Sequence, residues 1–125
     1  MRIICDTNIF IHFFNGDLAT AEALQKIGRE SILLPFVTKM ELFRGMLNRK
    51  DMDGMIKKLK VYDVLECNEL ASAKAVELVR DFKLSHDLKI PDAIIGALAI
   101  IYQVPLFTYN RKDFRFMPGI ILYEP

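Results

Sequence analysis

The chain has 125 residues, of which 52% are apolar and 26% charged, and its formal net charge is +1. This composition predicts one globular domain and excludes a disordered or fibrous protein. No stretch has the length and apolar character of a membrane span, and the first residues lack the pattern of a cleavable signal. Cys5 and Cys67 match no metal-binding or redox spacing, so we expect a reduced, cytoplasmic protein without a membrane partner.

Short apolar strands alternate with helical stretches along the chain. The strands are expected at residues 2–5, 31–34, 64–66, 106–108 and 120–123. Apolar residues recur at helical spacing, or fill the segment almost completely, at residues 17–27, 38–47, 51–59, 71–82 and 91–102. This alternation predicts an α/β fold, with a short, mainly parallel sheet of about four to five strands flanked by helices. Without a repeat or linker, residues 1–125 are expected to form a single domain.

The first strand ends at Asp6, directly after an unbroken apolar run. Ligands of open parallel sheets bind just beyond the carboxyl ends of the strands. Asp6 is therefore the first residue expected in a functional site. The following residues 9–14 are apolar at five of six positions, which is more than one helical face can bury. Either a partner covers this segment or the domain encloses it, and the sequence leaves both possibilities open.

A second acid, Glu41, has a purely structural explanation. The segment from Thr38 to Glu41 reads as a capping box, in which Thr38 caps a helix and Glu41 bonds back to the backbone of the cap. Taken alone, this explanation is the preferred one. Glu41 also borders the apolar stripe of its helix, so we expect it near the edge of the core.

Asp92 and Asp113 complete the set of notable acids. Asp92 follows Pro91 at the start of a helix in which residues 93–103 carry no charge, so the helix is expected in the interior. A carboxylate at least partly buried there needs a compensating polar partner or a metal. Asp113 follows a strand, where it could either pair with Arg111 and Lys112 on the surface or join a site.

The four acids are all expected at one edge of the sheet. Carboxyl ends of parallel strands and amino ends of the following helices meet at that edge, which brings Asp6, Glu41, Asp92 and Asp113 into reach of one another. Converging carboxylates repel unless a cation neutralises them. Ligand sets made of oxygen suit Mg²⁺ or Mn²⁺, and these ions activate water for displacement at phosphorus.

An ordered set of short motifs resembles the PIN-domain ribonucleases, particularly the VapC-like toxins of toxin–antitoxin pairs. The matching motifs are Cys5-Asp6-Thr7-Asn8, Met40-Glu41-Leu42 with Gly45, Ile90-Pro91-Asp92-Ala93-Ile94-Ile95, and Leu106-Phe107-Thr108-Tyr109-Asn110-Arg111-Lys112-Asp113-Phe114. The resemblance thus covers nearly the whole chain. It implies a metal-dependent endoribonuclease that acts as a toxin, with an antitoxin that covers the active-site groove and with a second copy in a homodimer. The apolar segment 9–14 would suit the antitoxin contact.

The resemblance also implies roles for individual residues. Asp6, Glu41 and Asp92 would be catalytic and would bind Mg²⁺ or Mn²⁺. Position 110 is an amide where other branches of the family have an acid, which favours Asp113 as the fourth carboxylate. The polar residues expected to frame the site are Thr7, Asn8, Thr108 and Asn110.

Basic residues outnumber acids between residues 44 and 60. A solvated helical face is the commoner explanation for such a cluster, and a surface that attracts RNA is the more specific one. The residues expected to hold the RNA backbone are Arg44, Arg49, Lys50, Lys57, Arg111 and Lys112.

Two other functions are compatible with the chain. The first is a non-enzymatic phospho-acceptor signalling domain, although Asp6 lacks the acidic neighbour typical of such domains. The second is an idle PIN-like module that only binds RNA or a partner. A metal-free nuclease would need paired histidines, and nothing in the sequence places His12 and His86 together.

Overall fold

A four-stranded parallel sheet forms the centre of the protein, whose computed structural model describes residues 1–125. Its strands are β1 (Ile3–Cys5), β2 (Ile32–Pro35), β3 (Asp63–Leu65) and β4 (Leu106–Phe107). They are arranged in the order β3-β2-β1-β4, and every neighbouring pair is parallel. The central strand β1 is almost completely buried, as its unbroken apolar sequence predicts. The predicted α/β class and parallel sheet are therefore confirmed.

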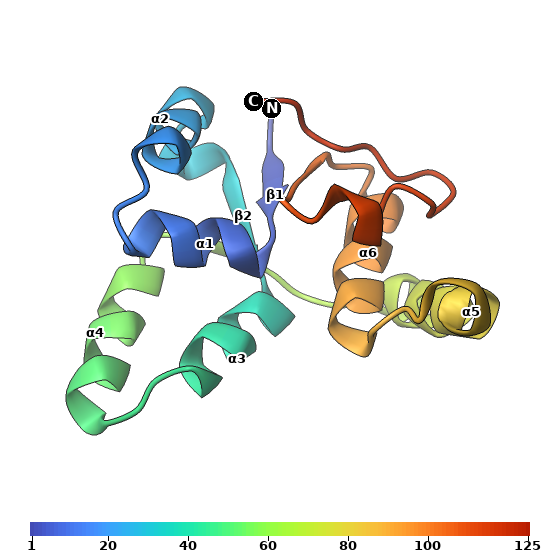
Figure 1. Cartoon of the computed structure of the whole chain (residues 1–125), viewed down its shortest axis with the longest axis horizontal. Helices are drawn as coiled ribbons and strands as arrows, with labels where there is room; N and C mark the ends of the chain where they lie inside the picture. Colours follow the sequence, from blue (N-terminus) through green and yellow to red (C-terminus); the bar gives the residue numbers. More distant parts are fainter.

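Helices cover both faces of the sheet (Figure 1). One side carries α1 (Thr7–Phe14), α2 (Leu18–Ile27), α3 (Phe36–Arg44) and α4 (Arg49–Leu59), and the other carries α5 (Glu69–His86) and α6 (Ile90–Tyr102). Side chains of β1 alternate between two cores: Ile3 and Cys5 pack toward α1–α4, whereas Ile4 packs toward α5 and α6. No helix combines the length and the apolar character that crossing a membrane requires.

The predicted fifth strand is wrong. Residues 120–123 run beside β4, where Leu106 N donates to Ile121 O and Tyr123 N donates to Leu106 O, both at 2.8 Å. Only one isolated bridge, between Leu106 and Leu122, results. The reason is that β4 is two residues long, so it presents a single residue to this neighbour and cannot support a ladder.

The predicted capping box is also wrong. Helix α3 begins at Phe36, directly after the last strand residue Pro35, so Thr38 lies inside the helix and does not cap it. The Thr38 side chain is fully buried. Its hydroxyl is hydrogen-bonded to that of Thr7 at 3.0 Å, and Glu41 also faces Thr7. Glu41 consequently does not serve as part of a helix cap.

Helix α5 is longer than its apolar stripe predicts because polar caps extend it at both ends. Asn68 accepts a hydrogen bond from Ala71 N at 2.8 Å and starts the helix before the first apolar residue of the stripe. At the other end, Asp87 adopts the left-handed conformation with φ 51° and terminates the helix. The loop that follows leads directly into α6 and sets the position of Asp92.

The apolar segment 9–14 forms most of α1 and is only partly enclosed. Ile9 and Phe10 are fully buried, whereas Ile11 is 46% exposed and His12 is also exposed. The domain therefore covers one side of this segment and leaves the other side open.

Candidate active site

Asp6 stands at the carboxyl end of β1 and begins helix α1. It is 5% exposed, and its Oδ1 accepts a hydrogen bond from Thr7 N at 2.7 Å. This bond caps the helix, whose amino end favours a negative charge. The central strand and the helix that follows it thus hold the Asp6 carboxylate at the sheet edge.

Asp6 is fixed further by two of the predicted framing residues. Its Oδ2 accepts hydrogen bonds from Thr108 Oγ1 at 2.8 Å and from Asn8 Nδ2 at 3.0 Å. Burial raises the pKa of Asp6, the bonds from Thr108 and Thr7 lower it, and the charge on Glu41 raises it again. The net result is a pKa above the ordinary value, since burial outweighs the hydrogen bonds.

Glu41 reaches the same site from α3. Thr7 Oγ1 donates to Glu41 Oε1 at 2.7 Å, so one residue contacts Asp6 through its backbone and Glu41 through its side chain. Glu41 is half-buried at the edge of the core, as the sequence predicts. Thr7 is therefore the link that positions both acids.

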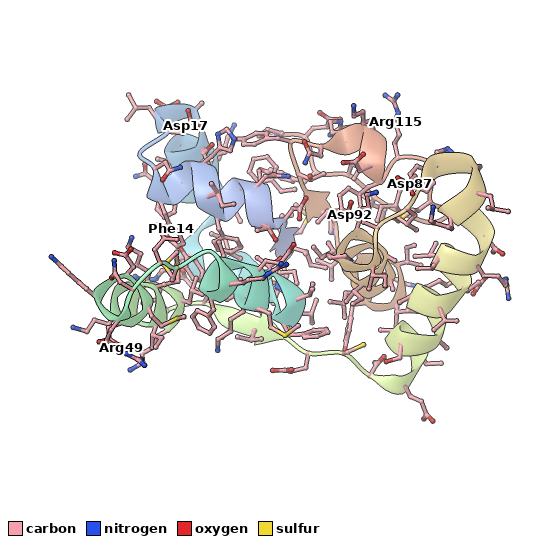
Figure 2. The ribbon with its side chains drawn as sticks, turned by 60° about the horizontal axis from the view of Figure 1, so that its bottom comes forward. Phe14, Asp17, Arg49, Asp87, Asp92 and Arg115 are labelled. Atoms are coloured by element: carbon pink, nitrogen blue, oxygen red, sulfur yellow. The ribbon has the colours of Figure 1, made fainter.

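Asp92 lies in the first turn of α6, a helix that contacts α3, which carries Glu41. Figure 2 shows it near the middle of the molecule, between the group α1–α4 and helix α5. Burial and, to a smaller extent, the charges of Asp6, Asp113 and Glu41 together raise its pKa to about 7. Asp92 thus lies close enough to each of the other three predicted acids for their charges to act on it.

The segment after β4 supplies the remaining predicted polar residues. Asp113 belongs to a short 3₁₀ turn, η2 (Arg111–Asp113), and lines a small cleft together with Asp92. Asn110 is exposed, and its backbone N donates to Thr108 Oγ1 at 3.0 Å. Asp113 consequently contributes its carboxylate to the acidic edge, whereas Asn110 contributes a backbone bond to a framing residue.

The predicted basic residues are divided between two regions. Arg44 ends α3, while Arg49, Lys50 and Lys57 lie on α4. Arg49 is far from Asp92 in Figure 2, and the two helices that carry them lie on opposite sides of the sheet in Figure 1.

Nearer the acids, the two basic residues of η2 point in different directions. Arg111 pairs with Glu124 at 2.6 Å and also donates to Tyr123 O, so its charge is directed to the C-terminal segment. Lys112 lines the cleft with Asp92 and Asp113. Lys89 lines the same cleft and was not predicted, although it stands just before the Ile90-Pro91-Asp92 motif.

The acidic edge has the chemistry of a site for a hard divalent cation. The charges of Asp6, Glu41 and Asp113 each raise the pKa of Asp92, so a cation bound there would offset repulsion among the acids. No group of three His, Cys, Asp or Glu side chains is arranged to hold one ion by itself. Mg²⁺ commonly binds through one or two carboxylates and completes its shell with waters and substrate oxygens, so the residues fit such an ion.

These features define a three-layer α/β protein with an acidic site at the carboxyl edge of its parallel sheet. The sequence profile of the PIN domain matches residues 3–119, and the chain belongs to the PIN-domain family.

The chain is also similar in sequence and structure to individual known proteins. Ribonuclease VapC1 of Methanocaldococcus jannaschii is 25% identical over 98% of this chain and 88% of its own length. A toxin–antitoxin complex from Klebsiella pneumoniae contains a chain that is 29% identical, with a TM-score of 0.79 and coverage of 98% of this chain and 99% of that one. A chain of VapBC-1 from nontypeable Haemophilus influenzae is 19% identical with a TM-score of 0.83, covers 99% and 98% of the two chains, and shares the fold.

Proposed function

We propose that the protein is an endoribonuclease that hydrolyses RNA phosphodiester bonds with the help of Mg²⁺ or Mn²⁺, and that it acts as the toxin of a toxin–antitoxin pair. The observation that supports the proposal is the position of Asp92, which shares a cleft with Asp113 and lies within reach of the charges of Asp6 and Glu41. The names of the similar proteins, a ribonuclease and a toxin–antitoxin complex, support the same activity and biological role.

Each acid is proposed to have a role that follows from its contacts. Asp6 is held by three hydrogen bonds and serves as a rigid metal ligand. Glu41 is positioned through Thr7 and contributes a second negative charge on the α3 side. A bound divalent ion would supply polarisation of the scissile phosphate and activation of a water. Asp92, which lies near the charges of Asp6, Glu41 and Asp113, would be a further ligand, because a cation would offset that repulsion.

A phospho-acceptor role is less compatible with the surroundings of Asp6. Signalling domains of that kind have two acids together at the end of the first strand, whereas Asp6 is followed by Thr7 and Asn8. An idle binding module remains distinguishable by experiment, because it would bind RNA without cleaving it.

The proposal includes two protein partners, each with a surface of suitable chemistry. A groove that Glu41 itself lines, here called the acid-side groove, has apolar residues of α1, of α4 and of the end of α3 with the turn after it, among them Ile11, Phe14 and Met46. An antitoxin segment lying there would block the acids, as the excess of apolar residues in α1 suggests. An apolar groove on the other side, here called the α5–α6 groove, contains no acid and would be covered by a second copy of the chain.

Cleavage of total cellular RNA by the purified protein tests the activity. We expect cleavage in Mg²⁺ or Mn²⁺, no cleavage after chelation with EDTA, and a rate at least about 100-fold lower for Asp6→Asn. Asp81→Asn, an equivalent change on the exposed face of α5, is the matched control and should cleave like the parent. Retention of the parental rate by folded Asp6→Asn would refute the proposal, and RNA binding without cleavage would favour the idle module.

A further inference from the structure

A small polar cleft adjoins Asp92 and Asp113 and contains groups that the proposed chemistry does not use. It has a volume of about 240 Å³ and lies where the loop between α5 and α6 meets the segment after β4. Figure 2 shows Asp87, from that loop, and Asp92 on this side of the molecule. The lining residues are His86, Asp87, Leu88, Lys89, Asp92, Lys112, Asp113 and Phe116.

One wall of this cleft is a stack of aromatic rings. The rings of His86 and Phe116 lie nearly parallel, with centroids 3.9 Å apart and an angle of 19°. Phe116 in turn packs against Phe82, and Ser85 Oγ is hydrogen-bonded to His86 Nδ1 at 2.7 Å. Phe116 covers one face of the His86 ring, while the His86 side chain is exposed. The stack therefore ends in a fixed, accessible ring, which is the feature on which proteins stack the bases of single-stranded RNA.

Two lysines enter the same cleft from different segments. Lys89 precedes α6, and Lys112 belongs to η2. Lys112 makes no ion pair, whereas Lys89 contacts Asp87 at 2.7 Å. Asp87 also pairs with Lys83 at 2.7 Å, so two lysines share this one carboxylate, while Lys112 lines the cleft beside Asp92 and Asp113. Exposed ion pairs of this kind contribute little to stability, so the fold gives no strong reason for both lysines to face the acids.

We propose that this cleft is a nucleotide subsite, in which His86 stacks on the base and Lys89 and Lys112 bind the phosphate of the RNA nucleotide next to the scissile bond. This inference rests on the proposed ribonuclease function. The volume of the cleft suits one nucleotide of a strand better than a larger ligand, since sites for whole small molecules usually exceed about 300 Å³. Only two of its eight lining residues are apolar, which favours RNA over a hydrophobic protein segment.

The phosphate contacts can be tested with Lys89→Gln and Lys112→Gln. Lys26→Gln in α2 is the matched control, because it removes the same charge on the other side of the sheet. Binding is measured by fluorescence anisotropy with a labelled single-stranded RNA ten-mer of randomised sequence, in EDTA and at several KCl concentrations. We expect each cleft variant to weaken binding about three- to tenfold and to reduce the slope of log K against log salt by about 0.7. Lys26→Gln should match the parent.

The base contact can be tested with His86→Ala and His86→Phe. Loss of a stacked base should weaken binding by at least about fivefold in His86→Ala, and the aromatic ring of His86→Phe should restore it. With an oligonucleotide that spans a mapped cleavage site, His86→Ala should raise KM and leave kcat within about twofold. With an oligonucleotide that is abasic at the position next to the scissile bond, His86→Ala and the parent should have the same KM.

The outcomes separate this inference from the nuclease proposal. Parental binding and KM in the lysine and His86→Ala variants would overturn the subsite. Unchanged RNA binding with weakened antitoxin binding would also overturn it and would assign the cleft to the protein partner. RNA binding by a parent that does not cleave would overturn the nuclease alone, and absence of RNA binding would overturn both.

Discussion

Asp6 and Asp92 are two carboxylates of one site whose surroundings differ at the level of individual contacts. Asp6 is more deeply buried, but three hydrogen bonds compensate part of the cost of its charge. Asp92 has the neighbouring acids around it, and its pKa is about 7 because burial and those charges act together. The negative charge of Asp92 is thus the more costly one in the absence of a cation.

This difference predicts how stability depends on pH. Without metal, native Asp92 keeps its proton up to about pH 7, while the unfolded chain loses it near pH 3.8. The native state then binds more protons, so its stability falls as pH rises from about 4 to 7. We expect Asp92→Asn to gain about 1 kcal/mol relative to the parent between pH 4 and 8, a value reduced for partial exposure.

Urea unfolding in EDTA at several pH values measures this gain. Asp81→Asn is the control, because Arg80 lowers the pKa of Asp81 and no gain is expected in this range. A constant difference between Asp92→Asn and the parent across pH 4 to 8 would contradict the electrostatic interpretation. Added Mg²⁺ should stabilise the parent more than Asp92→Asn, since the ion offsets the repulsion among the acids.

At the scale of elements, α6 shows how small residues allow close packing of a central helix. Gly96 lies in the buried middle of α6, and an added Cβ there would overlap the sulfur of Met117. Met117 is only 2% exposed, so its side chain has little room to move. Gly54 lies within α4, where an added Cβ would meet no atom within 4 Å.

The two glycines therefore predict opposite effects of the same substitution. Gly96→Ala should lower the free energy of unfolding by about 1–3 kcal/mol because it overpacks the core. Gly54→Ala should raise it by about 0.5–1 kcal/mol because alanine favours the helix and meets no obstacle. Urea or thermal unfolding of both variants checks the prediction. A stabilising effect of Gly96→Ala would mean that Met117 can adjust at little cost.

The sequence predicts elements where a regular pattern dominates and fails where a contact with another segment decides. The strand before Asp6 and the apolar helix after Pro91 were predictable because burial is encoded in continuous apolar runs. The start of α3 was not, because the local pattern at Thr38 and Glu41 is that of a cap, whereas the hydroxyl of Thr7 binds both side chains. Asn68 is a signal for the start of α5 that apolar periodicity alone overlooks.

The candidate site was predictable in its acids and less so in its cations. The order of strands and helices is enough to bring the four carboxylates to one edge. Which lysines face them depends on a loop and a 3₁₀ turn that have no periodicity. Arg111 and Lys112 are neighbours in sequence, yet one turns to Glu124 and the other lines the cleft of Asp92.

At the scale of the whole molecule, two apolar surfaces are left uncovered on opposite sides of the sheet. The acid-side groove lies next to Glu41, so whatever covers it controls access to the acids. The α5–α6 groove is lined mainly by apolar residues, including Val76, Val79 and Ile94. Val76 is 71% exposed and Ile90 is 67% exposed at its border, which is costly in water unless another surface covers them.

A charge placed in the α5–α6 groove should therefore separate the proposed homodimer. We expect Val76→Glu to weaken dimerisation at least tenfold, because burying a carboxylate among apolar residues is costly and Arg80, the basic residue of the groove, is already paired with Asp81. Val61→Glu is the control: Val61 is 50% exposed and lies before β3, at the opposite end of that strand from Cys67 in the groove. Sedimentation velocity over a range of protein concentrations gives the molecular mass of each variant. A parent that remains monomeric at high concentration, or a Val76→Glu variant that dimerises like Val61→Glu, would show that a second copy does not occupy this groove.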